Sequence, residues 1–128
     1  MSAIAWVQPE SLDELRAALR DGARLHGGGT GLMRSRPSGG TIADLAHAGI
    51  AGVEARDGFV RAGGAAPIAT VARELGRRDA GHLVARALAG MAAPALRNRI
   101  TIGGSLALFP PWSSVVGPLL AVGTSLSL

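Results

Sequence analysis

The chain has 128 residues, of which 48% are hydrophobic and 17% are charged, which excludes a disordered protein and predicts a folded domain with one core. All thirteen basic residues behind the net charge of +4 are arginines, and they are scattered along a chain with only four aromatic side chains, so nucleic-acid binding is not expected. The absence of cysteine excludes disulfides and iron–sulfur ligation by this chain, and the three histidines lack metal-binding spacing.

The N-terminal residues predict a helix and no targeting signal. Met1 to Glu10 contain no basic segment followed by an apolar run, so we expect no signal peptide and a cytoplasmic location. Ser11 and Glu14 have the spacing of a capping box, in which the two side chains satisfy the first free amides of a helix. Leu12, Leu15 and Leu19 then recur on one face, and Gly22 is expected to end the helix.

Short strands and turns follow. Arg24 to His26 predicts a strand that leads into the glycine run Gly27 to Gly31, with a helical turn beginning at Leu32. A second strand is expected at Thr41 to Asp44. Asp57-Gly58 is typical of a type I′ hairpin turn, here between the strands Val53 to Arg56 and Phe59 to Ala62.

A change of composition near Ala48 to Gly52 marks a boundary between two subdomains. The expected fold is α+β, with a small βαβ-like N-terminal subdomain in residues 1–52 and a second α+β subdomain in residues 53–128. The second subdomain is expected to be incomplete at its C-terminus, because the chain closes on a strand-like segment with no partner after it.

The second half is predicted to be mainly helical. Pro67 opens a helix that Gly76 is expected to close, and another runs from His82 to Met91. A strand at Ile100 to Ile102 leads into a second glycine turn. The remaining expectations are an interrupted helix at Ser113 to Gly123 and a strand at Thr124 to Leu128.

The two glycine turns are the candidate binding elements. Glycine amides can converge on an anion, because a backbone without Cβ adopts left-handed conformations and approaches a ligand closely. The alternative is that they are ordinary tight turns. The dinucleotide motif G-x-G-x-x-G and the phosphate-binding G-K-S/T motif are both excluded, since the sixth glycine and any lysine are missing.

Both turns resemble one flavoprotein family. Leu25 to Met33 is similar to the Ala-Gly-Gly-Thr-Asp-Leu-Leu loop of the FAD-binding domain of molybdopterin dehydrogenases, which has the PCMH-type fold. Arg97 to Ala107 resembles that family's Arg-Asn-Arg-Gly-Thr-Ile-Gly-Gly-Asn-Leu-Ala signature. The resemblance implies that the two loops hold the FAD pyrophosphate through Gly27, Gly28, Gly29, Thr30, Gly31, Leu32, Thr101, Ile102, Gly103, Gly104 and Ser105.

This resemblance also implies a function. Flavin domains of the family pass electrons from iron–sulfur clusters to an external acceptor, and their partners are a molybdopterin-binding large subunit and a 2Fe-2S small subunit. The chain is then part of an FAD-dependent oxidoreductase such as xanthine or carbon monoxide dehydrogenase, and it needs no catalytic side chain of its own because the cofactor carries the chemistry.

Two other classes of function stay open at this stage. A flavin-free remnant acting as a structural or interaction module is one. A membrane-associated protein is the weaker one, because Ile100 to Leu128 carries no charge but is interrupted by glycine and proline. His26 is either a phosphate contact or an ordinary residue at the end of a strand.

Overall fold

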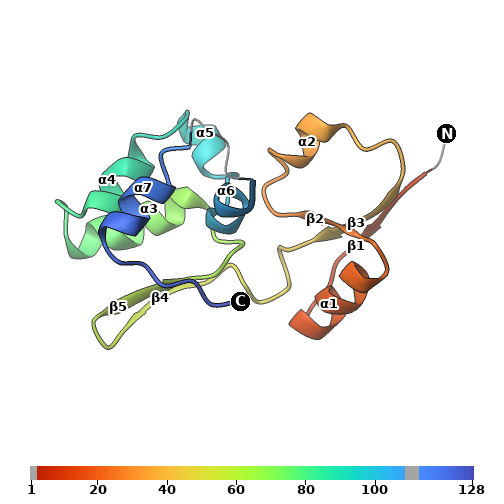
Figure 1. Cartoon of the computed structure of the whole chain (residues 1–128), viewed down its shortest axis with the longest axis horizontal. Coiled ribbons are helices and arrows are strands. Elements are labelled where there is room, and N and C mark those ends of the chain that lie inside the picture. The colour runs from red at the N-terminus through yellow and green to blue at the C-terminus, as the bar shows by residue number, and fades with distance from the viewer. Residues whose placement is uncertain (1–2, 109–112) are drawn as a thin grey trace.

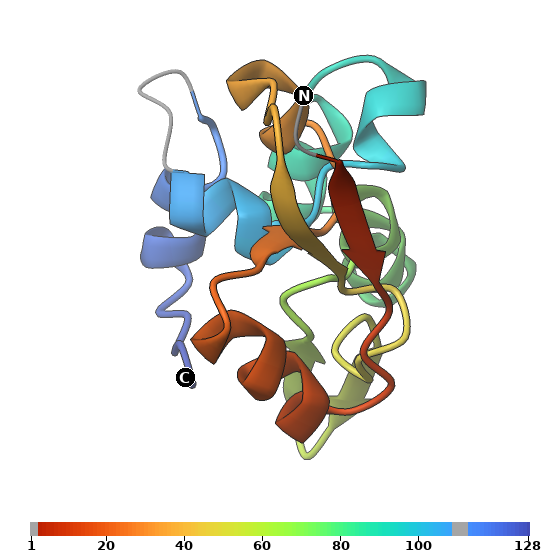
Figure 2. The same cartoon turned by 90° about the vertical axis from the view of Figure 1, so that its right-hand side faces the viewer.

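The computed structural model describes residues 3–108 and 113–128 and has two parts (Figure 1). The first part contains β1 (Ile4–Val7), α1 (Leu12–Arg20), β2 (Arg24–His26), α2 (Leu32–Ser35) and β3 (Gly40–Asp44). Its strands form a parallel sheet in the order β1-β3-β2, with α1 and α2 on opposite sides. Figure 2 shows β3 beside β1, with α1 below them.

The first helix begins as the capping-box pattern predicts. Ser11 Oγ accepts a hydrogen bond from the Glu14 amide at 3.2 Å, and the Glu14 carboxylate accepts one from the Glu10 amide at 2.9 Å. Gly22, with a φ of +85°, turns the chain after the helix. The buried side of α1 places Leu15 against Ala43 of the central strand, so the small core of this part lies between one helix and one sheet face.

Over its described residues, 53–108 and 113–128, the second part contains a hairpin and five helices. The hairpin is formed by β4 (Val53–Arg56) and β5 (Phe59–Ala62), and Asp57 and Gly58 both have positive φ, as the predicted type I′ turn requires. The helices are α3 (Ile68–Arg78), α4 (Leu83–Ala89), α5 (Pro94–Arg97), α6 (Ile102–Leu108) and α7 (Val116–Ala121). Their core is built around Ile68, Val84, Leu88 and Val115, all nearly inaccessible to solvent.

Three expectations about the second half are wrong. Ile100 to Ile102 is no strand: Thr101 forms one isolated bridge with Pro67, and α6 begins at Ile102. Thr124 to Leu128 is exposed and pairs with no described strand. Gly76 does not end α3, which continues to Arg78, because a glycine without positive φ fits the helix there.

The described residues of the charge-free C-terminal region include two short helices, α6 and α7. Within residues 3–108 and 113–128, no helix has the length and apolarity needed to cross a membrane.

Candidate functional site

The first glycine run forms a loop, Gly27 to Gly31, between the end of β2 and the start of α2. Two of its carbonyl oxygens are used by α2: Gly29 accepts from the Met33 amide and Gly31 from the Arg34 amide. Its own amides are free, because none from Gly27 to Gly31 donates a hydrogen bond to any residue that the structure describes. We call these five residues the glycine loop. It is a run of unpaired donors of the kind that binds anions.

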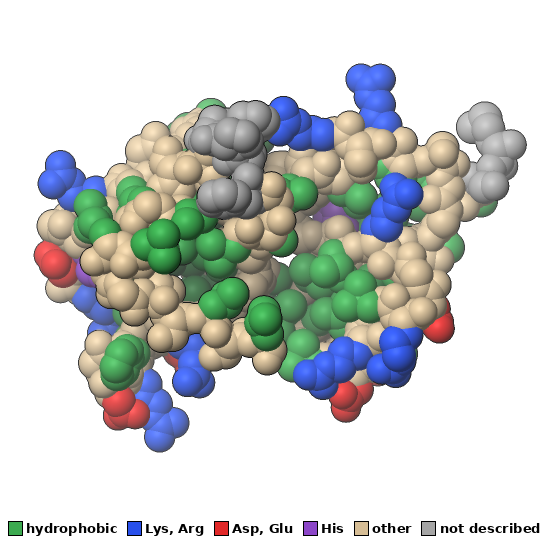
Figure 3. Space-filling model, viewed as in Figure 1, with side chains coloured by type: hydrophobic (Ala, Val, Ile, Leu, Met, Phe, Trp, Pro, Cys, Tyr) green, Lys and Arg blue, Asp and Glu red, His purple; other side chains and the backbone are tan. Residues whose placement is uncertain are grey.

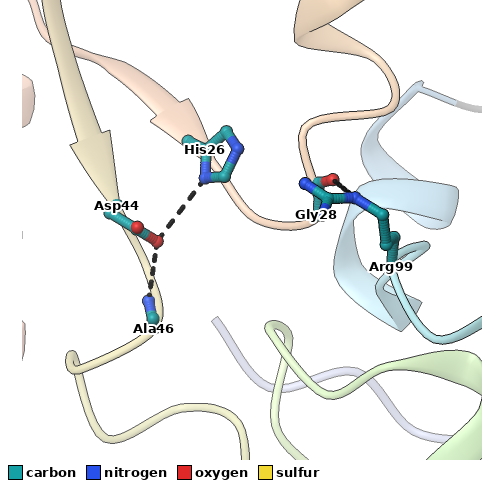
Figure 4. A network of polar contacts seen from close by, with 5 residues as sticks. All are labelled: His26, Gly28, Asp44, Ala46 and Arg99. Atoms are coloured by element: carbon teal, nitrogen blue, oxygen red, sulfur yellow. Dashed lines mark hydrogen bonds and ion pairs between the residues drawn. The ribbon is translucent and has the colours of Figure 1, made fainter.

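The segment before α6 packs directly against the glycine loop, although about 70 residues separate the two in sequence. Arg99 Nε donates a hydrogen bond of 3.1 Å to the carbonyl oxygen of Gly28 (Figure 4). A Cβ atom on Gly28 would overlap the carbonyl group of Arg99, and one on Gly27 would lie 3.1 Å from Thr101 Oγ1. Glycine at position 28 is therefore required by backbone packing.

The second glycine pair lies in the first turn of α6 and its amides are already used. The Gly103 amide donates to the carbonyl oxygen of Gly64 at 2.8 Å, and the Gly104 amide donates to Thr101 Oγ1 at 3.1 Å. The amides of Ile102 and Ser105 are bonded as well, to Ala66 and Thr101. This segment therefore differs from the open glycine turn that the sequence pattern predicts.

Gly103 has a packing role toward the turn after β5. A Cβ atom on Gly103 would approach the carbonyl oxygen of Gly64 to 2.6 Å, closer than real side chains come. Three segments thus meet along one seam: the glycine loop, the Gly63–Gly64 turn, and residues 99–105. Sequence reasoning did not select Gly64 or Arg99 as site residues, although the Gly-Gly pair before a helix was a visible signal.

A small polar network stands beside the glycine loop. His26 Nδ1 lies 3.5 Å from Asp44 Oδ1, and the same oxygen accepts a hydrogen bond from the Ala46 amide at 3.1 Å (Figure 4). The ring of Trp6 packs against the imidazole with the centroids 4.9 Å apart. Both His26 and Asp44 have side chains 17% exposed, so this pair is largely shielded from solvent.

Other features of the surface do not compete with this site. Two shallow depressions surround the tip of the β4–β5 hairpin and include no residue of the seam. Figure 3 shows a hollow between the two parts of the molecule, with hydrophobic side chains gathered on both sides of it.

The family model described as the FAD binding domain in molybdopterin dehydrogenase matches residues 2–128. The chain belongs to this family. The domain of this family binds FAD, so the cofactor and the mixed helix–strand fold expected from the sequence are confirmed.

Solved structures agree with this assignment. A carbon monoxide dehydrogenase from Hydrogenophaga pseudoflava that lacks the Mo-pyranopterin moiety matches with a TM-score of 0.72 and 25% identity, over 81% of this chain and 39% of that one. Quinoline 2-oxidoreductase from Pseudomonas putida 86 matches with a TM-score of 0.69 and 28% identity, over 82% and 39%.

The cyanide-inactivated form of a Cu,Mo carbon monoxide dehydrogenase has the same fold, with a TM-score of 0.70 at 22% identity over 87% of this chain and 42% of that one. The chain thus spans about two-fifths of the length of these matched chains. No curated protein sequence matches it.

Proposed function

We propose that this chain is the FAD-binding part of an electron-transfer flavin subunit of a molybdenum hydroxylase, and that the glycine loop holds the FAD diphosphate. The observation that carries the proposal is the run of five unpaired amides from Gly27 to Gly31, fixed in place by its contact with residue 99. Successive unpaired backbone amides provide the partial positive charge that a diphosphate needs.

The two predicted segments would contribute differently to this site. Residues 27–32 would donate hydrogen bonds to the phosphates. Residues 101–105 would form the wall behind them, because the amides of Ile102, Gly103, Gly104 and Ser105 are bonded within the protein.

We also propose that residues 1–52 and 53–128 are the two subdomains of this flavin site. Separate sheets and two hydrophobic clusters support the division, although Ala65 of the second subdomain belongs to the first cluster. The FAD supplies the redox chemistry, and the residues of this chain bind and orient it.

The proposed partners are a molybdopterin-binding large subunit and a 2Fe-2S small subunit, in the cytoplasm. Because this chain has no cysteine, thiolate ligands for such clusters would have to come from another polypeptide.

Binding of FAD tests the proposal directly. The purified chain is incubated with FAD and desalted, and its absorption spectrum and thermal stability are recorded. Retained flavin absorbance and a higher melting temperature are expected, since a ligand that binds only the folded state stabilises it. A colourless protein whose melting temperature does not respond to FAD would contradict the proposal and favour a flavin-free interaction module.

A matched pair of variants tests whether the diphosphate binds at the glycine loop. Thr30→Asp adds a negative charge beside the free amides, whereas Thr30→Asn adds a side chain of nearly the same shape without charge. The aspartate is expected to weaken FAD binding about tenfold, which corresponds to about 1.4 kcal/mol of repulsion, and the asparagine to change it little. Equal FAD affinities for the two variants would show that the diphosphate does not bind at the glycine loop.

A further inference from the structure

His26 is the last residue of β2, directly before the glycine loop, and one of its two ring nitrogens already has a partner. Nδ1 faces Asp44 Oδ1 at 3.5 Å, and that oxygen is held by the Ala46 amide at 3.1 Å. A carboxylate accepts hydrogen bonds, so the proton of a neutral His26 is expected on Nδ1. Nε2 is left without a polar partner among the described residues.

This second nitrogen points toward the loop. A Cβ atom built on Gly29 would lie 2.6 Å from His26 Nε2, so the ring edge borders the backbone of Gly29 directly. Gly29 has a φ of +76° and is itself a residue whose amide is unpaired. Figure 4 shows the imidazole between Asp44 on one side and Gly28 with Arg99 on the other. The ring is held between Trp6 and Asp44, so its orientation is restricted.

We propose that His26 is a further ligand of the diphosphate, donating an Nε2–H hydrogen bond when its imidazole is protonated, and that it makes flavin binding pH-dependent. This inference rests on the proposed diphosphate site. The charged groups facing the ring are Asp44 from β3 and Arg99 from the segment before α6. β1 contributes only the uncharged Trp6.

The sign of the pH dependence follows from the charges. A bound diphosphate attracts the imidazolium, so binding takes up a proton and affinity rises as the pH falls. Histidine side chains change charge between about pH 5 and 8, whereas the diphosphate of FAD stays ionised throughout that range. The gain in affinity is complete at the acidic end of this pH range and is lost as the pH rises through the range. One charge-assisted hydrogen bond corresponds to about a tenfold change in affinity.

Two variants separate the nitrogens. His26→Asn keeps a polar atom near the position of Nδ1 but leaves nothing near Nε2. His26→Gln has a longer side chain that places an amide near the position of Nε2 and carries no charge at any pH. His47→Gln, which removes an exposed histidine in the turn after β3, is the control.

The dissociation constant of FAD is measured by flavin fluorescence from pH 5.5 to 8.5 for the full chain and each variant, with ADP-ribose as a competitor that carries the same diphosphate without the flavin. We expect about tenfold tighter binding at the acidic end for the parent and His47→Gln, a flat profile for both His26 variants, and weaker binding by His26→Asn than by His26→Gln.

A His26→Asn profile that follows the parent would overturn the role of His26 while leaving the diphosphate site intact. Failure of the parent to bind FAD or ADP-ribose at every pH would instead remove the proposed site itself. A change seen with FAD but not with ADP-ribose would place the effect at the flavin, which also contradicts the inference.

Discussion

The α-carbon of Gly28 faces the carbonyl group of Arg99 so closely that no side chain fits between them, while the Arg99 guanidinium reaches back to the Gly28 carbonyl oxygen at 3.1 Å. This reciprocal contact joins residues 71 positions apart and fixes the glycine loop against the second part of the molecule. Because the contact uses the Gly28 carbonyl, the amides of the loop stay free for a ligand.

Replacing Gly28 by alanine is expected to break this contact. The new methyl group would overlap backbone atoms of Arg99, which cannot move away as a flexible side chain can. We expect a loss of about 2 kcal/mol or more in the free energy of unfolding, measured by urea denaturation, together with loss of FAD binding. Gly76→Ala, inside α3, is the control: its methyl group would meet Ala85 of α4 at an ordinary 3.8 Å. Helix propensity predicts a gain of up to about 1 kcal/mol in the free energy of unfolding.

The Gly103–Gly64 contact makes a second prediction. Gly103→Ala brings a Cβ atom to 2.6 Å from a backbone oxygen, so α6 would have to shift away from the turn after β5. The melting temperature is expected to fall by several degrees, in line with a cost of about 1–3 kcal/mol. Gly117→Ala in α7, where nothing lies within 4 Å of the added atom, should leave it unchanged or higher. Similar melting temperatures for the two variants would show that the seam is loosely packed.

Arg99 can be tested for its hydrogen bond separately from its charge. Arg99→Ala removes both, whereas Arg99→Lys keeps the charge and loses the Nε donor to Gly28. We expect each to cost about 1 kcal/mol of unfolding free energy, with weaker FAD binding in both. Arg61→Ala, on the exposed edge of β5 with a long 3.9 Å ion pair, is the comparison and should be nearly neutral. Full FAD affinity in Arg99→Lys would mean that the charge, not the hydrogen bond, matters.

The capping box of α1 gives a prediction independent of the flavin site. Ser11→Ala leaves the Glu14 amide without its acceptor and is expected to cost about 1 kcal/mol of unfolding free energy. Ser114→Ala, at an exposed position, serves as the reference. FAD affinity should not change in either variant, since Ser11 caps the N-terminal end of α1 through its bond with Glu14 and has no hydrogen bond to the glycine loop. A change in affinity would imply that α1 and the site are coupled.

Glu74 predicts a small acid-dependent loss of stability. The hydrogen bond and the charge of Arg77, with a contact of 2.9 Å, lower the pKa of the Glu74 carboxyl below its usual value. The stabilisation is therefore present above the pKa of the unfolded chain and is lost as the pH falls through the lower folded value. Glu74→Gln should reduce the melting temperature slightly at neutral pH and have no effect in strong acid. High salt should weaken the difference, because Arg77 is exposed.

Local patterns in the sequence predicted the local structure well. The capping box, the Asp57-Gly58 hairpin and the strand before the first glycine run are all present, because each depends on neighbouring residues. The second glycine segment was misjudged. Its apolar Ile100–Ile102 run has the composition of a strand but finds only a single bridging residue, so the glycines that follow continue as a helix.

The parts of the site that the sequence did not predict depend on distant contacts. No pattern around Arg99 says that its backbone meets Gly28, and none around Gly64 says that it receives the Gly103 amide. β1 was not predicted either, since a four-residue strand with all its residues exposed carries little periodicity. Which amides stay free is therefore decided by packing between the two parts.

The backbone contacts of the seam affect how far the sequences of such domains can diverge. Because Gly28 and Gly103 meet backbone atoms, which every residue type carries, these two contacts do not depend on which side chains stand opposite them. The sequence would then change slowly at these few glycine positions and faster elsewhere. Such backbone contacts would allow a fold to be kept, with TM-scores near 0.7, while only about a quarter of the residues stay identical.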